Sequence, residues 1–228
     1  MALPNSGVEK IASIRESGRK AYEEGTLKLF TSFPETLKSR FNVSLIGHFG
    51  MLARYIIGLD TYFNLDGFLP VLDFPEHSTM LEAVWEGSEK DRIKVFEELR
   101  FRASRYVRKA NIRSLLYSDI VLDSVGSVLV VAENIPDSIL ELRGELTGLY
   151  TEHGLKVLPM DNMLHSTILR IRKIPSGLGG GVVEFRYAVE SLPHPHGPKG
   201  PRPHGGLRFS VTRFYVGSAL DLLTTRTW

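Results

Sequence analysis

The segments PEHSTMLEAVW (residues 75–85) and NMLHSTILRIR (residues 162–172) share the tripeptide His-Ser-Thr followed by an apolar residue. Both segments have the apolar, branched composition of β-strands. Side chains alternate along a strand, so the histidine and the threonine of each copy lie on one face and the serine on the other. The sequence therefore predicts two strands that each present an imidazole beside a hydroxyl, with Met80 or Ile168 anchoring the strand from behind.

The chemistry of the repeated pair points to phosphate. If His77 and Thr79 face His165 and Thr167 across a cleft, the site holds two proton-transfer groups and two hydroxyl donors. In-line attack on a phosphodiester needs this combination. The alternative is a structural role, in which both histidines lie on half-buried strands and bind neighbouring groups.

The two motifs give the chain a resemblance to the two-histidine (2H) phosphoesterases, the superfamily of the LigT-type RNA ligases and cyclic nucleotide phosphodiesterases. Their signature is a duplicated His-x-[Ser/Thr]-apolar strand, and the resemblance spans about residues 65–217. It implies an α+β fold of two duplicated lobes, with antiparallel sheets lining a central cleft and helices outside. Residues 65–228 would form this bilobal domain. Residues 1–64 match nothing and are expected to form a mostly helical extension, with a contribution to the core left open.

The resemblance also implies a metal-independent and cofactor-free phosphodiesterase. The expected substrate is a cyclic phosphodiester, either a 2′,3′-cyclic nucleotide or the cyclic phosphate at an RNA end. His77 and His165 would be general base and acid, in an order that the sequence does not fix, and Thr79 and Thr167 would bind the phosphate. Formation of a 2′,5′ RNA bond and a non-catalytic RNA- or nucleotide-binding module are the alternatives.

The composition is that of an ordinary globular protein. The chain has 228 residues, 43% hydrophobic and 24% charged, with a net charge of +2 and no cysteine. These values exclude disulfides and thiolate nucleophiles, and give no general attraction to nucleic acid or anionic membrane. No membrane partner and a cytoplasmic location are expected, and the oligomeric state stays open.

The segment PHPHGPKGPRPHGG, residues 193–206, is too rich in proline and glycine for regular structure, so we expect a loop. Its charged and imidazole side chains are His194, His196, Lys199, Arg202 and His204. Three interpretations remain: a histidine metal site, a mobile basic flap over a phosphate cleft, and a solvated connection.

Periodicity predicts the remaining elements. Helices are expected at 7–30, from Pro34, from the Ser88 cap to about Lys109, and from Pro136 to near Gly154. The helix from Ser88 to about Lys109 should bury Ile93, Phe96, Leu99, Ala103 and Val107. Strands are expected at 114–122, 126–132, 182–192 and 207–217, with a turn at 177–181.

Some features of the sequence allow more than one interpretation. The run at 41–59 fits a buried helix or a strand equally well. The segment RFRASRYVRKANIR, residues 100–113, carries six basic residues that could bind RNA phosphates or form a solvated surface; they are Arg100, Arg102, Arg105, Arg108, Lys109 and Arg113. Tyr117, Tyr187 and Tyr215 could stack on a base or pack in the core, whereas His48 and His153 are expected to be structural or exposed.

Overall fold

The fold is known from a computed structural model that describes residues 7–49, 68–70, 76–132, 134–159, 163–171 and 207–224. The helices are α1 (Gly7–Glu23), the 3-10 helix η1 (Glu35–Ser39), α3 (Glu89–Ala110), α4 (Asp137–Glu152) and α6 (Ala219–Thr224). The strands are β1 (Arg40–Phe49), β2 (Phe68–Pro70), β3 (His77–Val84), β4 (Ser114–Tyr117), β5 (Asp119–Leu122), β6 (Ser127–Ala132), β7 (Lys156–Val157), β8 (Leu164–Ile171) and β9 (Leu207–Ser218).

The strands form two sheets, one with the order β4-β9-β1-β3-β7 and the other with the order β2-β8-β6-β5. Every strand pair is antiparallel. The predicted α+β class with antiparallel sheets is confirmed, and each sheet contains one of the two motif strands. β4 and β5 are separated only by Ser118 and lie at the edges of different sheets, so this stretch of chain passes directly from one sheet to the other.

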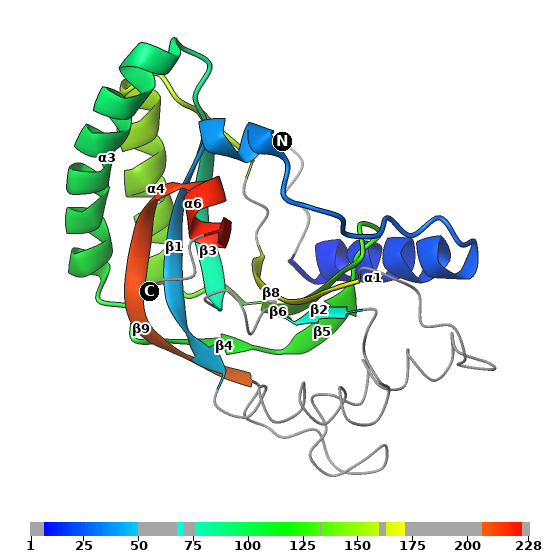
Figure 1. The fold of residues 1–228 in the computed structure, drawn as a ribbon. Helices are drawn as coiled ribbons and strands as arrows, with labels where there is room; N and C mark the ends of the chain where they lie inside the picture. The colour runs from blue at the N-terminus through cyan, green and yellow to red at the C-terminus, as the bar shows by residue number, and fades with distance from the viewer. Residues whose placement is uncertain are drawn as a thin grey trace, which may run out of the picture.

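Helices α3 and α4 lie side by side and cover one face of the five-stranded sheet (Figure 1). Their contacts with the sheet are aromatic and aliphatic. The Phe41 ring lies 4.6 Å from that of Phe96 on α3 and 5.3 Å from that of Tyr150 on α4, measured between centroids. Edge-to-face packing of this kind adds to the energy of burial. This cluster is the main hydrophobic core, and it continues onto Val128, Val130 and Ile168 of the second sheet.

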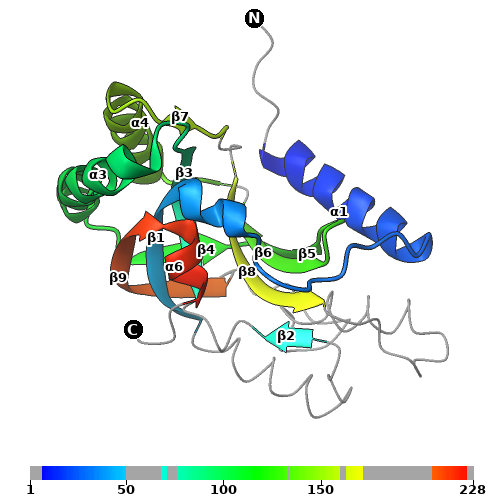
Figure 2. The ribbon, with the colours of Figure 1, turned by 45° about the horizontal axis from the view of Figure 1, so that its top comes forward.

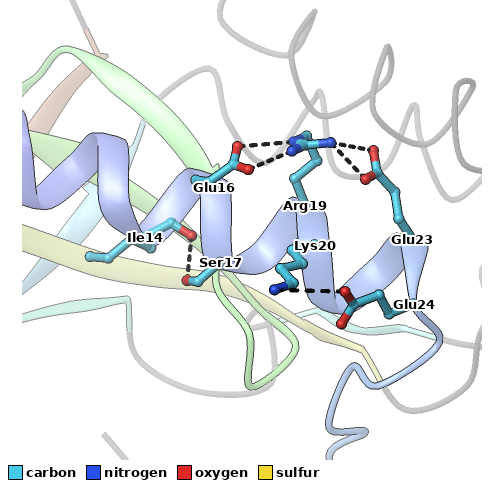
Figure 3. A network of polar contacts seen from close by, with 7 residues as sticks. All are labelled: Ile14, Glu16, Ser17, Arg19, Lys20, Glu23 and Glu24. Carbon is cyan, nitrogen blue, oxygen red and sulfur yellow. Dashed lines mark hydrogen bonds and ion pairs between the residues drawn. The ribbon is translucent and has the colours of Figure 1, made fainter.

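Helix α1 lies on the other side of the molecule, against β5 and β6 (Figures 1 and 2). Ile11 packs there with Val121, Leu129, Val131 and Met163, in a second and smaller core. The helix approaches the sheet closely at Gly18, where a Cβ atom would lie 2.0 Å from the carbonyl oxygen of Leu122. Its outward face carries ion pairs between Arg19 and the carboxylates one turn before and after it (Figure 3). Exposed pairs of this kind contribute little to stability.

The run at 41–59 begins as a strand, and its residues 50–59 lie outside the described part of the chain. β1 is the middle strand of its sheet and is buried at every position from 41 to 46. Burial on both faces removes the alternation of polar and apolar residues, which is why periodicity could not distinguish a strand from a helix. Residues 40–49 belong to the region expected as an N-terminal extension, and here they lie at the centre of the larger sheet. The expected boundary at residue 64 is outside the described residues.

The strongest helix predictions are confirmed. Ser88 caps α3, since its hydroxyl accepts a hydrogen bond from the backbone N–H of Asp91 at 3.2 Å. Pro136 precedes α4, which ends before Gly154. Two details are wrong. Ile93 is 58% exposed instead of buried, because it lies outside the face of α3 on which Leu99, Ala103 and Val107 are buried. The first helix ends at Glu23 instead of residue 30.

Several predicted features lie outside the described residues: the loop at 193–206, the strand at 182–192 with Tyr187, and the turn at 177–181. Within the described ranges, no helix is long and apolar enough to cross a membrane. In the same ranges, no group of three or more imidazole, thiol or carboxylate side chains is arranged to hold a metal ion.

Candidate functional site

The two motif strands, β3 and β8, belong to different sheets and contact each other. A reciprocal pair of hydrogen bonds joins them. The Ser78 hydroxyl donates to the carbonyl oxygen of His165 at 3.1 Å, and the Ser166 hydroxyl donates to the carbonyl oxygen of His77 at 2.6 Å. The middle residue of each tripeptide therefore binds the first residue of the other, and the backbones of the two histidines lie close together.

The faces of the two strands are those that alternation predicts. Ser78 and Ser166 are 0% and 1% exposed, and they point into the molecule. The histidine and threonine of each motif are half-buried and lie on the opposite face. The structure therefore brings together the strands that carry His77, Thr79, His165 and Thr167. Their catalytic roles stay a prediction.

Both motif strands contain a β-bulge at the same place. The register of β3 against β1 shifts so that Met80 is the extra residue, and the register of β8 against β6 shifts so that Ile168 is the extra residue. Each bulge directly follows the motif threonine. A bulge reverses which side chains face the core, so Leu81 points into the core together with Met80. The apolar residue that ends each motif is thus the extra residue of the bulge, and the bulge changes which side chains face the core after the threonine.

The motif face of the larger sheet continues from β3 across β1 to β9. Thr79 pairs with Ser44, their hydroxyl oxygens lie 3.4 Å apart, and Ser44 pairs in turn with Tyr215. The Tyr215 hydroxyl donates to the carbonyl oxygen of Ser218 at 2.8 Å. Burial raises the pKa of Tyr215, Asp221 raises it further and Arg100 opposes the shift. The phenol is therefore neutral near pH 7 and adds a polar group on the motif side of the sheet.

The second motif borders the small core under α1. His165 pairs with Val131 and Thr167 pairs with Leu129, so these four side chains share one face of the second sheet. Val131 and Leu129 pack in the same cluster as Ile11 of α1. Helix α1 therefore lies on the face of the second sheet that carries His165 and Thr167.

A buried arginine lies behind the motifs. Arg143 of α4 is 8% exposed and donates from Nε to the carbonyl oxygen of Met80 at 3.1 Å and from Nη2 to that of Met163 at 3.2 Å. Burial lowers the pKa of Arg143, and the neighbouring Tyr117 opposes that shift. An arginine pKa starts so high that the guanidinium stays charged at physiological pH.

Tyr117 completes the polar group behind the strands. Its ring is fully buried and packs against the rings of Phe49 and Phe209. Burial raises the pKa of Tyr117, whereas the Ser78 hydroxyl and the charge of Arg143 act in the opposite direction. Within the described part of the chain, the Tyr117 hydroxyl forms no hydrogen bond of regular geometry. Of the two possibilities for this tyrosine, packing in the core is confirmed.

Glu76 precedes the first motif and anchors the start of β3. Its carboxylate accepts a hydrogen bond from the backbone N–H of Phe49 at 2.6 Å. Burial raises the pKa of Glu76, and this hydrogen bond and His48 oppose the shift. The contact holds the end of β1 beside the first histidine.

Two of the remaining histidines, His48 and His153, lie within the described residues. His153 is structural: its Nδ1 lies 2.8 Å from the carbonyl oxygen of Leu149, and its Nε2 lies 3.2 Å from Glu98 and from Arg102. Lys109 forms an ion pair with Glu145 of α4. His48 is exposed. His194, His196 and His204 lie outside the described residues.

Sequence reasoning missed the linking role of Ser78 and Ser166 and the presence of Arg143. The serines carried a signal, because they are identical in both copies although the general motif leaves that position variable. Arg143 carried a weaker one, as a charge within the apolar stripe of Ile139, Leu142 and Leu146.

Comparison with known proteins finds solved structures that resemble this chain, among them the two given below. No family model matches the chain, and no curated protein sequence matches it. A crystal structure of a phosphoesterase is similar with a TM-score of 0.42 and 19% identity, over 59% of this chain and 75% of the other. Usb1 of Kluyveromyces marxianus is similar with a TM-score of 0.40 and 10% identity, over 78% of this chain and 97% of the other.

Proposed function

We propose that this protein is a two-histidine phosphodiesterase that hydrolyses a cyclic phosphodiester without a metal ion. The substrate is a 2′,3′-cyclic nucleotide or the cyclic phosphate at an RNA end. The observation that carries the proposal is the reciprocal bonding of Ser78 and Ser166 to the opposite histidine carbonyls. It supports a site in which two copies of one motif present their histidine and threonine side by side.

The chemistry divides between the two imidazoles. One is neutral and accepts a proton from water as the water oxygen bonds to phosphorus. The other is protonated and donates to the ribose oxygen as its bond to phosphorus breaks. An unperturbed imidazole pKa of about 6.5 suits both roles near neutral pH. Which histidine is the base depends on which ribose oxygen leaves.

The threonines stabilise the charge that grows on phosphate. Thr79 and Thr167 donate hydroxyl hydrogen bonds to the non-bridging oxygens in the transition state. The protonated histidine supplies the positive charge that a metal ion brings in other phosphodiesterases. The reaction therefore needs no residue beyond the two motifs for proton transfer and charge stabilisation.

The test is to incubate the purified protein with each of the four 2′,3′-cyclic nucleotides and with a short RNA that ends in a cyclic phosphate, in the presence of a chelator. We expect ring opening to a monophosphate, and the position of the phosphate in the product identifies the leaving oxygen. The His77→Ala and His165→Ala proteins, prepared in the same way, control for contaminating nucleases. A folded wild-type protein that leaves every substrate unchanged would refute the proposal. Binding without turnover would indicate a non-catalytic module, and joined RNA ends would indicate a 2′,5′ ligase.

A further inference from the structure

Arg143, Tyr117 and Ser78 form a polar group behind the motif strands. Arg143 is the charged member of this group, and the proposed chemistry does not use it. Arg143 enters from α4, whose other inward residues are aliphatic or aromatic. Taking a guanidinium out of water is costly unless its N–H groups find acceptors. The acceptors of Arg143 therefore determine where its guanidinium lies.

Among the described residues, Arg143 binds one acceptor from each half of the site. Met80 immediately follows Thr79 and is the extra residue of the first bulge, and Met163 lies two positions before His165. Both acceptors are backbone carbonyls, so the contacts fix the course of the main chain and not the conformation of a side chain. One planar group thus spans from the end of the first motif to the approach of the second.

The geometry of the guanidinium makes this contact stiff. Its N–H groups diverge at fixed angles in a plane, whereas the ammonium of lysine is a single point with rotating donors. Nε and Nη2 are separated by a rigid group of bonds, so two carbonyls that bind them are held at a set distance. The serine bonds fasten the two strands directly, and Arg143 fixes them from the helix side.

We infer that Arg143 is a positioning residue, which sets the separation of the two motif strands and thereby the distance between the paired histidines. This inference rests on the proposed function. A displacement of about 1 Å can cost about two orders of magnitude in rate when two groups must act together. The effect should fall on kcat, because both motifs remain present to bind phosphate.

The decisive experiment is a double-mutant cycle with Arg143→Met and His77→Ala. Methionine keeps the apolar bulk of the stem and removes the bridge. We expect Arg143→Met to lower kcat about 10- to 100-fold with KM changed less than about threefold. In the His77→Ala background the same change should cost less than about threefold, since alignment has no value once one partner is gone.

Leu146→Ala is the matched control. Leu146 is fully buried on α4, one turn after Arg143, and donates no hydrogen bond to either motif strand. It should lower the free energy of unfolding and leave kcat close to that of the wild type while the protein is folded. An equal loss of kcat in Leu146→Ala, or an equal cost of Arg143→Met in both backgrounds, would overturn the inference.

Arg143→Lys covers the case in which the methionine variant does not fold. Lysine keeps the charge and the stem, but its single nitrogen cannot span both carbonyls. We expect a loss of kcat similar to that of methionine, and wild-type turnover in Arg143→Lys would contradict the inference. A wild-type protein with no turnover at all would refute the proposed function instead, so the two failures are distinguishable.

Discussion

The histidine and threonine of each motif share a half-buried face, yet they have different tasks in the proposed reaction. The imidazoles move protons, and the hydroxyls only donate hydrogen bonds to charge that develops on phosphate. Substitution at the four positions should therefore give two sizes of effect.

We expect His77→Ala and His165→Ala each to lower kcat by about 10²- to 10⁴-fold, the usual cost of losing a general acid or base. Thr79→Ala and Thr167→Ala should each cost about 10- to 100-fold. The double histidine variant should be little worse than either single one, because acid and base act in one step.

The control for these variants is the triple replacement of His194, His196 and His204 by alanine, which should leave turnover nearly intact. If that triple variant is inactive and the motif variants are active, a metal site in the 193–206 loop becomes the better hypothesis.

Asp123 permits a test of electrostatics away from the site. Its carboxylate accepts backbone hydrogen bonds from Val125 at 3.0 Å and Ser127 at 2.7 Å. Burial nevertheless raises the pKa of Asp123, with those bonds and Arg170 opposing the shift. The folded state therefore binds this proton more tightly than the unfolded chain, and the carboxylate weakens the fold when it is ionised.

Asp123→Asn keeps an oxygen acceptor and removes the charge. Its free energy of unfolding should exceed that of the wild type at pH 7. The gain should shrink as the pH falls through the raised pKa, and it should be small near pH 4, where the aspartate of the unfolded chain also begins to bind its proton. Urea unfolding of both proteins between pH 4 and 7 measures this difference. A gain that grows toward acid pH would show that the ionised carboxylate stabilises the fold.

The sequence predicted which face of each motif strand a side chain occupies, but not which residues of other elements it contacts. Strand alternation was enough to place His77 and Thr79 on one face and Ser78 on the other, because the period of a strand is local. The bond from Ser78 to the His165 carbonyl was not predictable, since it depends on how two sheets meet. Arg143 was missed for the same reason: its acceptors come from two other elements.

At the scale of elements, the docking of α1 depends on a glycine. Gly18→Ala would place a Cβ atom 2.0 Å from the Leu122 carbonyl oxygen, so the helix would have to move away from β5. We expect a loss of about 1–3 kcal/mol in the free energy of unfolding, the typical cost of overpacking.

Gly144→Ala is the control for the Gly18 variant. Gly144 is an exposed glycine inside α4, and a Cβ atom there would have no neighbour within 4 Å. The substitution should stabilise the protein by about 0.5–1 kcal/mol, since alanine is the better helix former. Denaturant unfolding measures both changes, and a stabilising Gly18→Ala would show that α1 does not pack tightly on the sheet.

Elements with local signals were predicted well, and those defined by distant partners were not. Ser88 and Pro136 announce their helices within a few residues, so α3 and α4 were found with nearly correct bounds. β1 has no such signal. Its partners are β3 and β9, and its burial on both faces follows only from its place between them.

The whole molecule joins its two sheets along the motif strands, so one imidazole comes from each sheet. If one must be neutral and the other protonated, kcat/KM should rise and then fall with pH between about 5 and 8. Initial rates across that range measure the profile, with circular dichroism at each pH to confirm that the protein stays folded. A flat profile would show that histidine protonation does not limit the reaction.

The place of β1 has a consequence for the order in which the protein can be made. β1 is synthesised well before one of its two neighbours, β9, which pairs Phe209 with Phe49. Until β9 leaves the ribosome, an apolar strand edge has no partner and can pair with other chains. The nascent protein should therefore depend on chaperones until β9 has been made, and β1, the neighbour of the first motif strand, should gain its second partner only then.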